Sequence, residues 1–239
     1  MQTKRSILFN VVTNLVLCFL IFSVGLVCFL PTDSEAGSTD EEGLYRSGAT
    51  SSDGVSLMFN VYWGTEEVYQ ILDILDEYEG KSTFFIGGSW ADDNVACLKE
   101  IVDRGHELGN HGYFHKDHAK ISKEENKNEI VRCNQFVALA TGVTPILFAP
   151  PSGAYTSQTL SVCKSLQMKT ILWSRDTIDW RDKDASVIYT RATKNIQGGE
   201  FVLMHPMSAT VKALPDILKH YKSQNLRCVT VGENLRLGG

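Results

Sequence analysis

Two histidines separated by three residues are the side chains in this sequence best suited to chemistry. His111 and His115 stand in the segment Gly-Asn-His-Gly-Tyr-Phe-His, residues 109–115. Two neutral imidazoles at this spacing can bind one divalent ion, zinc above all, if the chain between them is tightly turned. A polar loop with incidental histidines is the alternative, because His106 and His118 lie nearby and the segment lacks a His-Glu-x-x-His glutamate.

Other polar residues stand just after short apolar runs that are typical of β-strands. Three of them, each with the run that precedes it, are Asn60 after 55–59, Asp179 after 170–173 and His205 after 201–204. In parallel βα folds the functional site lies at the carboxyl ends of the strands. We therefore expect these residues and the histidine pair to meet at one mouth of the fold.

The elements that must position these residues alternate along the chain. Predicted strands cover 55–59, 83–86, 146–148, 170–173, 201–204 and 228–231. Predicted helices cover 68–75, 95–102, 123–140, 159–166, 187–196 and 211–221. This alternation gives about six or seven βα units and predicts an α/β fold with a mostly parallel sheet, either a TIM-type barrel or a distorted, incomplete one.

The first thirty residues differ in kind from the rest. Lys4 and Arg5 precede an apolar run over 7–30, which is long enough to span a bilayer. Basic residues before the run and acidic residues after it predict that the N-terminus stays inside and the rest lies outside the cytoplasm. We predict a transmembrane anchor over 1–31, or a cleaved signal segment that would give a secreted protein, since small residues at 34–36 offer a cleavage site.

Composition limits what the remainder can be. The stretch 32–52 is rich in Ser, Thr, Gly, Asp and Glu and predicts a flexible linker, which leaves one domain over 53–239. A net charge of -5 and a pI near 5.7 argue against nucleic-acid binding. The cysteines of the domain lack a Cys-x-x-Cys pair and predict buried apolar side chains, with disulfides left open: Cys97, Cys133, Cys163 and Cys228.

Five segments, in order, resemble the motifs of the polysaccharide deacetylase family, also called the NodB-homology family or carbohydrate esterase family 4. They are the second-strand signature at Thr83–Ile86, H-[ST]-x-x-H at His111–His115 with Gly112 departing, F-R-P-P-x-G-x-Y at Phe148–Tyr155, D-x-x-D-W at Asp176–Trp180, and L-x-H at Leu203–His205. The similarity runs over nearly the whole of the predicted domain. Five matches in family order are far rarer by chance than any single one.

The resemblance implies a distorted (β/α) barrel and metal-dependent hydrolysis of N-acetyl groups on amino-sugar polymers such as peptidoglycan or chitin. It implies a divalent metal on His111 and His115, with His205 as proton donor and Asp179 holding the imidazole of His205. The positions that match the sugar groove of the family are Pro151, Tyr155, Trp180 and Leu203. Trp63 and Trp173 are predicted to be core residues instead.

The sequence departs from the family where the catalytic base should stand. The family's first motif is F-D-D, whereas this chain has Phe59, Asn60 and Val61 in a context similar to the sporulation-associated peptidoglycan deacetylases. Asn60 cannot take up a proton as a carboxylate does, and Val61 offers no lone pair to a metal. Because Val61 supplies no acidic ligand, the metal is expected to bind weakly or not at all. Ala149 replaces the arginine that pairs with the base in the family.

These observations predict a membrane-tethered protein that acts on or binds cell-wall glycan with N-acetylglucosamine units. Deacetylase activity is expected to be attenuated or absent, because several catalytic groups are altered together. An active metal-dependent N-deacetylase is one alternative. A scaffold or partner-binding protein, in which the barrel has no chemical role, is the other.

Overall fold

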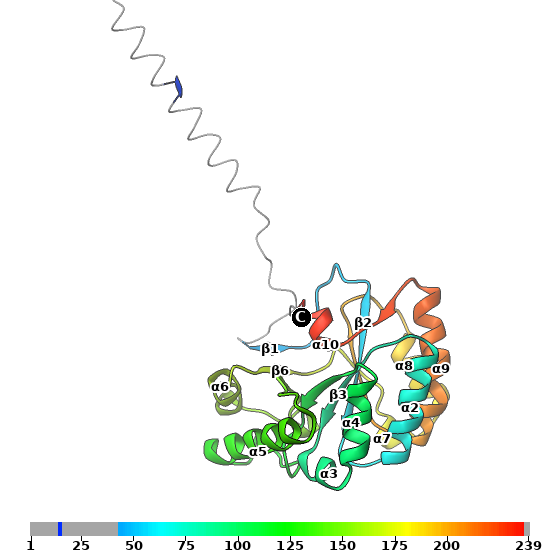
Figure 1. The fold of residues 1–239 in the computed structure, drawn as a ribbon. Coiled ribbons are helices and arrows are strands. Elements are labelled where there is room, and N and C mark those ends of the chain that lie inside the picture. Colours follow the sequence, from blue (N-terminus) through cyan, green and yellow to red (C-terminus); the bar gives the residue numbers. More distant parts are fainter. Residues whose placement is uncertain (1–13, 16–42, 237–239) are drawn as a thin grey trace, which may run out of the picture. The chain divides into compact units, whose positions relative to one another are not determined.

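The computed structural model describes residues 14–15 and 43–236, and a sheet of parallel strands lies at the centre of the larger part (Figure 1). In sheet order the strands are β1 (Leu44–Tyr45), β6 (Lys169–Ile171), β5 (Leu147–Phe148), β4 (Glu107–Asn110), β3 (Thr83–Ile86), β2 (Gly54–Val61), β8 (Phe201–Met204) and β7 (Arg175–Asp176). β9 (Arg227–Cys228) pairs with the start of β2. The order ends at β1 and β7, which do not pair within the described residues, so the predicted distorted and incomplete barrel is confirmed.

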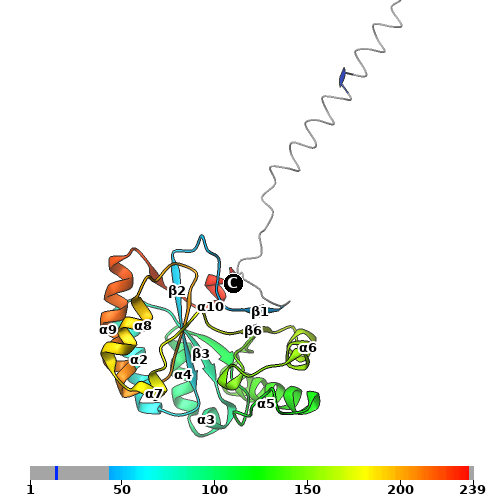
Figure 2. The ribbon, with the colours of Figure 1, turned by 180° about the vertical axis from the view of Figure 1, so that it is seen from behind.

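Helices cover the outer face of the curled sheet. They are α2 (Thr65–Glu77), α3 (Gly88–Asp93), α4 (Val95–Asp103), α5 (Lys123–Thr141), α6 (Ser157–Ser165), α7 (Asp179–Asp182), α8 (Ala185–Thr193), α9 (Ser208–Ser223) and α10 (Val231–Asn234), with a 3-10 turn η1 at Pro151–Gly153. Figures 1 and 2 show α2, α8 and α9 together beside one end of the sheet, and α5 and α6 together beside the other end.

The central strand β2 divides its side chains between two apolar cores. Leu57, Phe59 and Val61 pack in the large cluster that also contains the buried side chains of the outer helices. Met58 packs in a second cluster with residues of β3, β5, β6 and β8. Successive side chains of a strand point to opposite faces, so position 60 belongs to the face of Met58, on the inside of the curl.

The helices predicted from apolar spacing are confirmed with small shifts at their ends. α2 buries Val68, Ile71, Leu72 and Leu75, the residues whose spacing predicted it. α5 begins at Lys123 because Ser122 and Glu125 form a capping box, and it ends before Gly142, which adopts a left-handed conformation.

β4 is a strand that the apolar pattern did not predict. Its sequence, Glu-Leu-Gly-Asn, contains one apolar side chain, yet it pairs with β3 through four residues of each strand. The carboxylate of Glu107 accepts hydrogen bonds from the Thr83 hydroxyl at 2.6 Å and the Gly232 amide at 3.0 Å. Gly109 lies against the ring of Phe85, which leaves no space for a side chain. β4 therefore depends on tertiary contacts, and it leads directly into His111.

Two predicted boundaries are corrected. The described part of the predicted linker, 43–52, contains β1, in which Leu44 is fully buried because it pairs with β6. The predicted strand over 228–231 ends at Cys228. The Thr230 side chain accepts a hydrogen bond from the Glu233 amide at 3.1 Å and so starts α10 instead.

The predicted anchor over 1–31 lies outside the described residues, apart from Asn14 and Leu15. In the portions that are described, 14–15 and 43–236, no helix combines the length and the apolar character needed to traverse a bilayer. Cys97, Cys133 and Cys163 are buried free thiols, as predicted, and Cys228 is a free thiol at intermediate exposure.

Replacement of Gly109 by alanine is expected to destabilise the protein by about 1–3 kcal/mol, because the new methyl group overpacks against the buried Phe85 ring. Chemical denaturation of the native chain and the variant measures this difference. Phe85→Leu makes room at the same place, so the double variant should lose less stability than the sum of the single losses. Additive losses would show that the two side chains do not compete for this space.

Candidate active site at the carboxyl ends of the strands

A cavity of about 540 Å³ opens at the carboxyl ends of the parallel strands. β2, β7 and β8 supply Asn60, Asp176 and Leu203, and His111 follows β4. The complete lining is Asn60, Tyr62, Trp63, His111, His115, Ser152, Trp173, Asp176, Trp180, Lys183, Leu203, His205 and Met207. Asn60, His205 and the histidine pair thus line one cavity, as their positions after the strands predicted.

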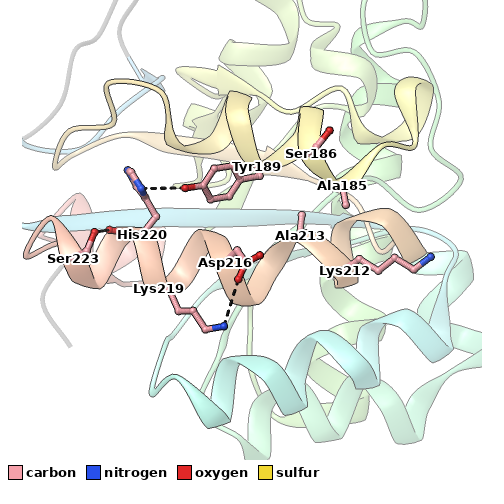
Figure 3. A pocket seen from close by; sticks show the side chains of 9 residues that line it. All are labelled: Ala185, Ser186, Tyr189, Lys212, Ala213, Asp216, Lys219, His220 and Ser223. Carbon is pink, nitrogen blue, oxygen red and sulfur yellow. Dashed lines mark hydrogen bonds and ion pairs between the residues drawn. The ribbon is translucent and has the colours of Figure 1, made fainter.

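A second hollow, of about 560 Å³, lies between α8 and α9 (Figure 3). Four of its polar side chains form two pairs: the Tyr189 hydroxyl is 3.3 Å from Nδ1 of His220, and Nζ of Lys219 donates to Asp216 at 3.4 Å. None of the predicted site residues lines this groove. The strand-end cavity, which the predicted site residues do line, is therefore the candidate active site.

The histidine pair is held in a defined arrangement. Nδ1 of His111 lies 2.7 Å from the Ala149 carbonyl oxygen, and since a carbonyl can only accept, Nδ1 carries the proton. This leaves a lone pair on Nε2, the arrangement that metal-binding histidines commonly adopt. The ring centroids of His111 and His115 are 5.0 Å apart with planes inclined at 65°.

Burial keeps both imidazoles neutral at neutral pH. Burial lowers the pKa of His111 well below its usual range, and the proximity of His115 lowers it further. Burial also lowers the pKa of His115. Both residues therefore offer lone pairs rather than positive charge to whatever enters the cavity.

Two polar side chains accept hydrogen bonds from the backbone between the two histidines and so fix its conformation. Asn110 accepts the Gly112 amide proton at 2.7 Å, and Glu129 of α5 accepts the Phe114 amide proton at 2.7 Å. Gly112 and His115 both adopt positive φ angles, 75° and 54°, which gives the tight turn that the spacing required. Sequence reasoning missed Glu129, although a buried acid on the inner face of a helix is an unusual feature that could have indicated it.

Asn60, the residue that the resemblance assigns to the position of the base, lines the cavity. It is 3% exposed, and among the described residues its Oδ1 has no hydrogen-bond partner. An unpaired buried carbonyl costs about 1–3 kcal/mol. Val61 does not line the cavity but packs in the outer apolar cluster, which corrects the expectation that position 61 would face the histidines. Ala149 is fully buried, and only its backbone oxygen serves the site.

His205 is held by a carboxylate whose two oxygens accept four hydrogen bonds. Asp179 Oδ1 accepts from Nδ1 of His205 at 2.8 Å and from the Trp180 amide at 2.9 Å. Oδ2 accepts from the His205 amide at 2.6 Å and from the Thr210 hydroxyl at 2.7 Å. The predicted pairing of Asp179 with His205 is thus present, and Nε2 is the nitrogen of His205 left for a ligand.

A continuous run of four aromatic rings joins the two sides of the cavity. The ring of Tyr62 stacks on that of His115, with 3.7 Å between centroids, and it contacts Trp63 edge-on, with 3.9 Å between centroids. The ring of Trp63 in turn stacks parallel to that of His205, with 5.6 Å between centroids. The Trp63 indole N–H lies 3.3 Å from the Met207 sulfur. Trp63 lines the cavity, which corrects the prediction that it is a core residue. Trp173 packs against the inner apolar cluster, as predicted, and also lines the cavity.

The predicted groove residues divide into two groups. Trp180 and Leu203 line the cavity, and the Trp180 side chain is half exposed at its mouth. Pro151 is buried beside Gly112 and does not line the cavity, and Tyr155 lies beyond the η1 turn and does not line it either. The turn instead presents Ser152, which adopts a positive φ of 55°.

The side chains present fit a divalent metal as a weak site only. Two neutral imidazoles with a fixed tautomer suit zinc, and the unpaired Oδ1 of Asn60 is a weak oxygen donor. No cluster of three His, Cys, Asp or Glu side chains that could hold a metal exists in the part of the chain that the structure describes. If a metal binds, His111 and His115 would hold it, and it would polarise an acetamide carbonyl.

An open parallel barrel that carries a histidine pair and an Asp–His pair at its strand ends defines a hydrolase fold of the NodB type. Residues 47–171 match the family described as polysaccharide deacetylase, and the chain belongs to this family.

Two curated relatives illustrate the range of the family. The uncharacterized protein YlxY of Bacillus subtilis is 35% identical over 196 residues, which are 82% of this chain and 61% of YlxY. The chain thus spans about three fifths of that relative. A peptidoglycan-N-acetylglucosamine deacetylase of Bacillus cereus is 35% identical over 173 residues, 70% of this chain and 81% of the relative.

Two solved structures of this family are similar to most of this chain. A CE4 family pseudoenzyme from Bacillus anthracis is 35% identical with a TM-score of 0.78, covering 80% of this chain and 68% of that chain. A mutant of that pseudoenzyme with restored enzymatic activity is 33% identical with the same TM-score of 0.78, covering 80% of this chain and 71% of that chain.

Asn60→Asp is expected to tighten zinc binding by about tenfold or more, because it places a negative oxygen ligand in the cavity beside two imidazoles. Titration of zinc against a competing chelator measures the affinity. His115→Ala in the same background should remove the gain. Equal zinc affinities of the native chain and Asn60→Asp would show that position 60 does not reach the ion.

Val61→Asp is expected to leave zinc affinity unimproved and to destabilise the fold by several kcal/mol, since the charge would replace a fully buried apolar side chain. Thermal unfolding and the same zinc titration test both parts. A folded Val61→Asp chain with tighter zinc binding would contradict the placement of Val61 in the outer core.

Proposed function

We propose that this chain binds N-acetylated cell-wall glycan outside the cytoplasm and hydrolyses it slowly or not at all. The observation that carries the proposal is Asn60, which occupies the cavity where a deacetylase of this family needs a carboxylate base. An amide does not accept a proton at neutral pH. The histidine pair and His205 still line the cavity, so glycan binding is retained while the proton-abstracting group is missing.

The remaining residues can bind and orient an acetamido sugar. His205, fixed by Asp179 through Nδ1, can accept a hydrogen bond at Nε2 from a group in the cavity, and as the imidazolium it can donate a proton from the same atom. Trp180 and Trp173 offer aromatic surface to a pyranose ring. Ala149 provides no cation to hold a charged base, so both halves of the family's base and arginine pair are replaced.

The comparisons support this proposal. The Bacillus anthracis relative is a pseudoenzyme, and a mutant of it has restored enzymatic activity. In that relative, mutation therefore restores an activity that the natural sequence lacks. We propose that Asn60 and Ala149 make that difference in this chain.

The proposed location rests on the N-terminal sequence. Lys4 and Arg5 before the apolar run 7–30 favour an anchor that keeps the N-terminus inside and the domain outside. A glycan-binding domain so placed would meet the cell wall directly.

An active deacetylase is the second candidate. The intact pair of Asp179 and His205 favours it, as does the similarity to a peptidoglycan-N-acetylglucosamine deacetylase. An active form would have to use a metal on two imidazoles without a carboxylate base.

Asn60→Asp is expected to raise acetate release from N-acetylglucosamine oligomers, with zinc added, by about tenfold. The increase should stay below the about 10²–10⁴-fold that a well-positioned general base contributes, because Ala149 leaves the new charge unpaired. His205→Ala in the Asn60→Asp background is expected to return release to the native level.

The surface variant Asn225→Asp adds the same charge at an exposed position and should release acetate like the native chain. If the native chain already releases acetate at a rate typical of enzymes, and Asn60→Ala does not change it, the active deacetylase is the correct function. If the native chain binds no glycan oligomer, a scaffold role replaces the proposal.

A further inference from the structure

We infer that Tyr62 is a positioning residue for the histidine pair: its ring holds the His115 imidazole where it can bind a divalent ion together with His111. The ring centroids of Tyr62 and His115 are 3.7 Å apart, and their planes are inclined at 26°. The inference goes beyond the proposed function, because it concerns how the metal side of the cavity is built. It holds whether or not the chain binds glycan.

His115 lacks the support that orients the other two histidines of the cavity. His111 is hydrogen-bonded to a backbone carbonyl, and His205 to the Asp179 carboxylate. Over the residues that the structure describes, no hydrogen bond joins the imidazole of His115 to another residue. Its closest ring contact is the stack on Tyr62, since the centroid of His111 is 5.0 Å away. The stack is therefore the contact that sets the plane of this imidazole.

The backbone of His115 is fixed, whereas its side chain has a choice of rotamers. The residue adopts a left-handed φ of 54°, which a residue other than glycine seldom does. The Glu129 carboxylate accepts the preceding amide proton, that of Phe114, at 2.7 Å. A fixed backbone still leaves staggered alternatives at χ1, and His115 is only half-buried. The ring of Tyr62 selects one of them.

Tyr62 reaches His115 because side chains alternate along an extended chain. Asn60 and Tyr62 are separated by one residue, and both line the cavity. Val61 lies between them and packs in the outer apolar cluster. The edge-on contact with Trp63, at 3.9 Å between centroids, supports the Tyr62 ring from the other side chain of the strand end. The ring over His115 therefore comes from the same strand end as Asn60.

The stack favours the ion-bound form of the imidazole over the free form. A divalent ion on His115 draws electron density from the imidazole, which then carries part of the positive charge. The face of an aromatic ring is electron-rich and attracts positive charge. Tyr62 therefore interacts more strongly with His115 when the ion is bound. It also reduces the loss of rotamer freedom on binding, because the ring is already in place.

A purely structural role is the alternative, because Tyr62 is half-buried and packs against the outer apolar cluster. Tyr189 shares both properties, and its ring lies beside that of His220, with 6.0 Å between centroids, outside the strand-end cavity. Tyr189→Ala is therefore a matched control, which removes a tyrosine ring beside a histidine away from the pair. Tyr62→Phe keeps the stacking ring and removes only the hydroxyl group.

Zinc titration against a competing chelator tests the inference on the full-length chain. All variants are made in the Asn60→Asp background, where zinc is expected to bind more tightly. Tyr62→Ala should weaken zinc binding by about threefold to tenfold, since the stack and its attraction for the charged imidazole are lost. Tyr62→Phe and Tyr189→Ala should bind zinc like their parent.

Nuclear magnetic resonance of the imidazole C–H groups in the presence of EDTA gives a second measurement without metal. The signals of His115, assigned with His115→Gln, should carry the ring-current shift of a stacked ring. Tyr62→Ala should abolish this shift, and Tyr62→Phe should keep it. The signals of His220 should respond to Tyr189→Ala and not to either change at position 62.

The inference is overturned if Tyr62→Ala binds zinc like its parent, if Tyr62→Phe or Tyr189→Ala weakens binding as much, or if the His115 signals ignore the loss of the ring. Failure of the Asn60→Asp chain to bind zinc would overturn it as well. Should Tyr62→Ala not fold, Tyr62→Leu keeps the apolar bulk without an aromatic face, and the same weakening is expected. None of these outcomes involves glycan, so the proposed function is judged separately.

Discussion

The pairing of β2 with β3 and β8 is the constraint on which the rest of the structure depends. This central strand sends Phe59 and Val61 into the outer core and Met58 into the inner one, and it ends at the cavity with Asn60. Because side chains alternate, a shift of one residue would exchange an amide for a valine at the floor of the site. The paired neighbours fix the register, and the two residues after Val61 then carry the aromatic rings that contact His115 and His205.

The histidines of the site are held in place by contacts that do not involve the side chains of Asn60 and Ala149. Asp179 organises His205 through hydrogen bonds to both its side chain and its backbone, and this arrangement makes no use of Asn60. His111 is likewise oriented by a backbone carbonyl that is present whatever side chain residue 149 carries. The geometry of these histidines therefore does not depend on the side chains at positions 60 and 149, and a well-formed cavity can persist whatever those side chains are.

Helices and strands with a local sequence pattern could be predicted from the sequence, whereas elements that depend on contacts between distant residues could not. α2 and α5 follow from apolar spacing and capping residues, and β2 and β8 from apolar runs. β4 could not be predicted, because its Glu-Leu-Gly-Asn sequence becomes a strand only through pairing with β3 and a hydrogen bond from Thr83. The resemblance located His111, His115, Asp179 and His205, whereas the stacking of Tyr62 and Trp63 depends on rotamers that no linear pattern records.

The contact between His111 and the Ala149 carbonyl has an evolutionary consequence. Its acceptor belongs to the main chain, so drift at position 149 changes the side chain without disturbing the imidazole that it orients. A lineage can therefore abandon hydrolysis by point substitution and keep the architecture that hydrolysis needs. The same carbonyl would orient His111 in a chain that regained the missing groups, so change in either direction leaves this contact in place.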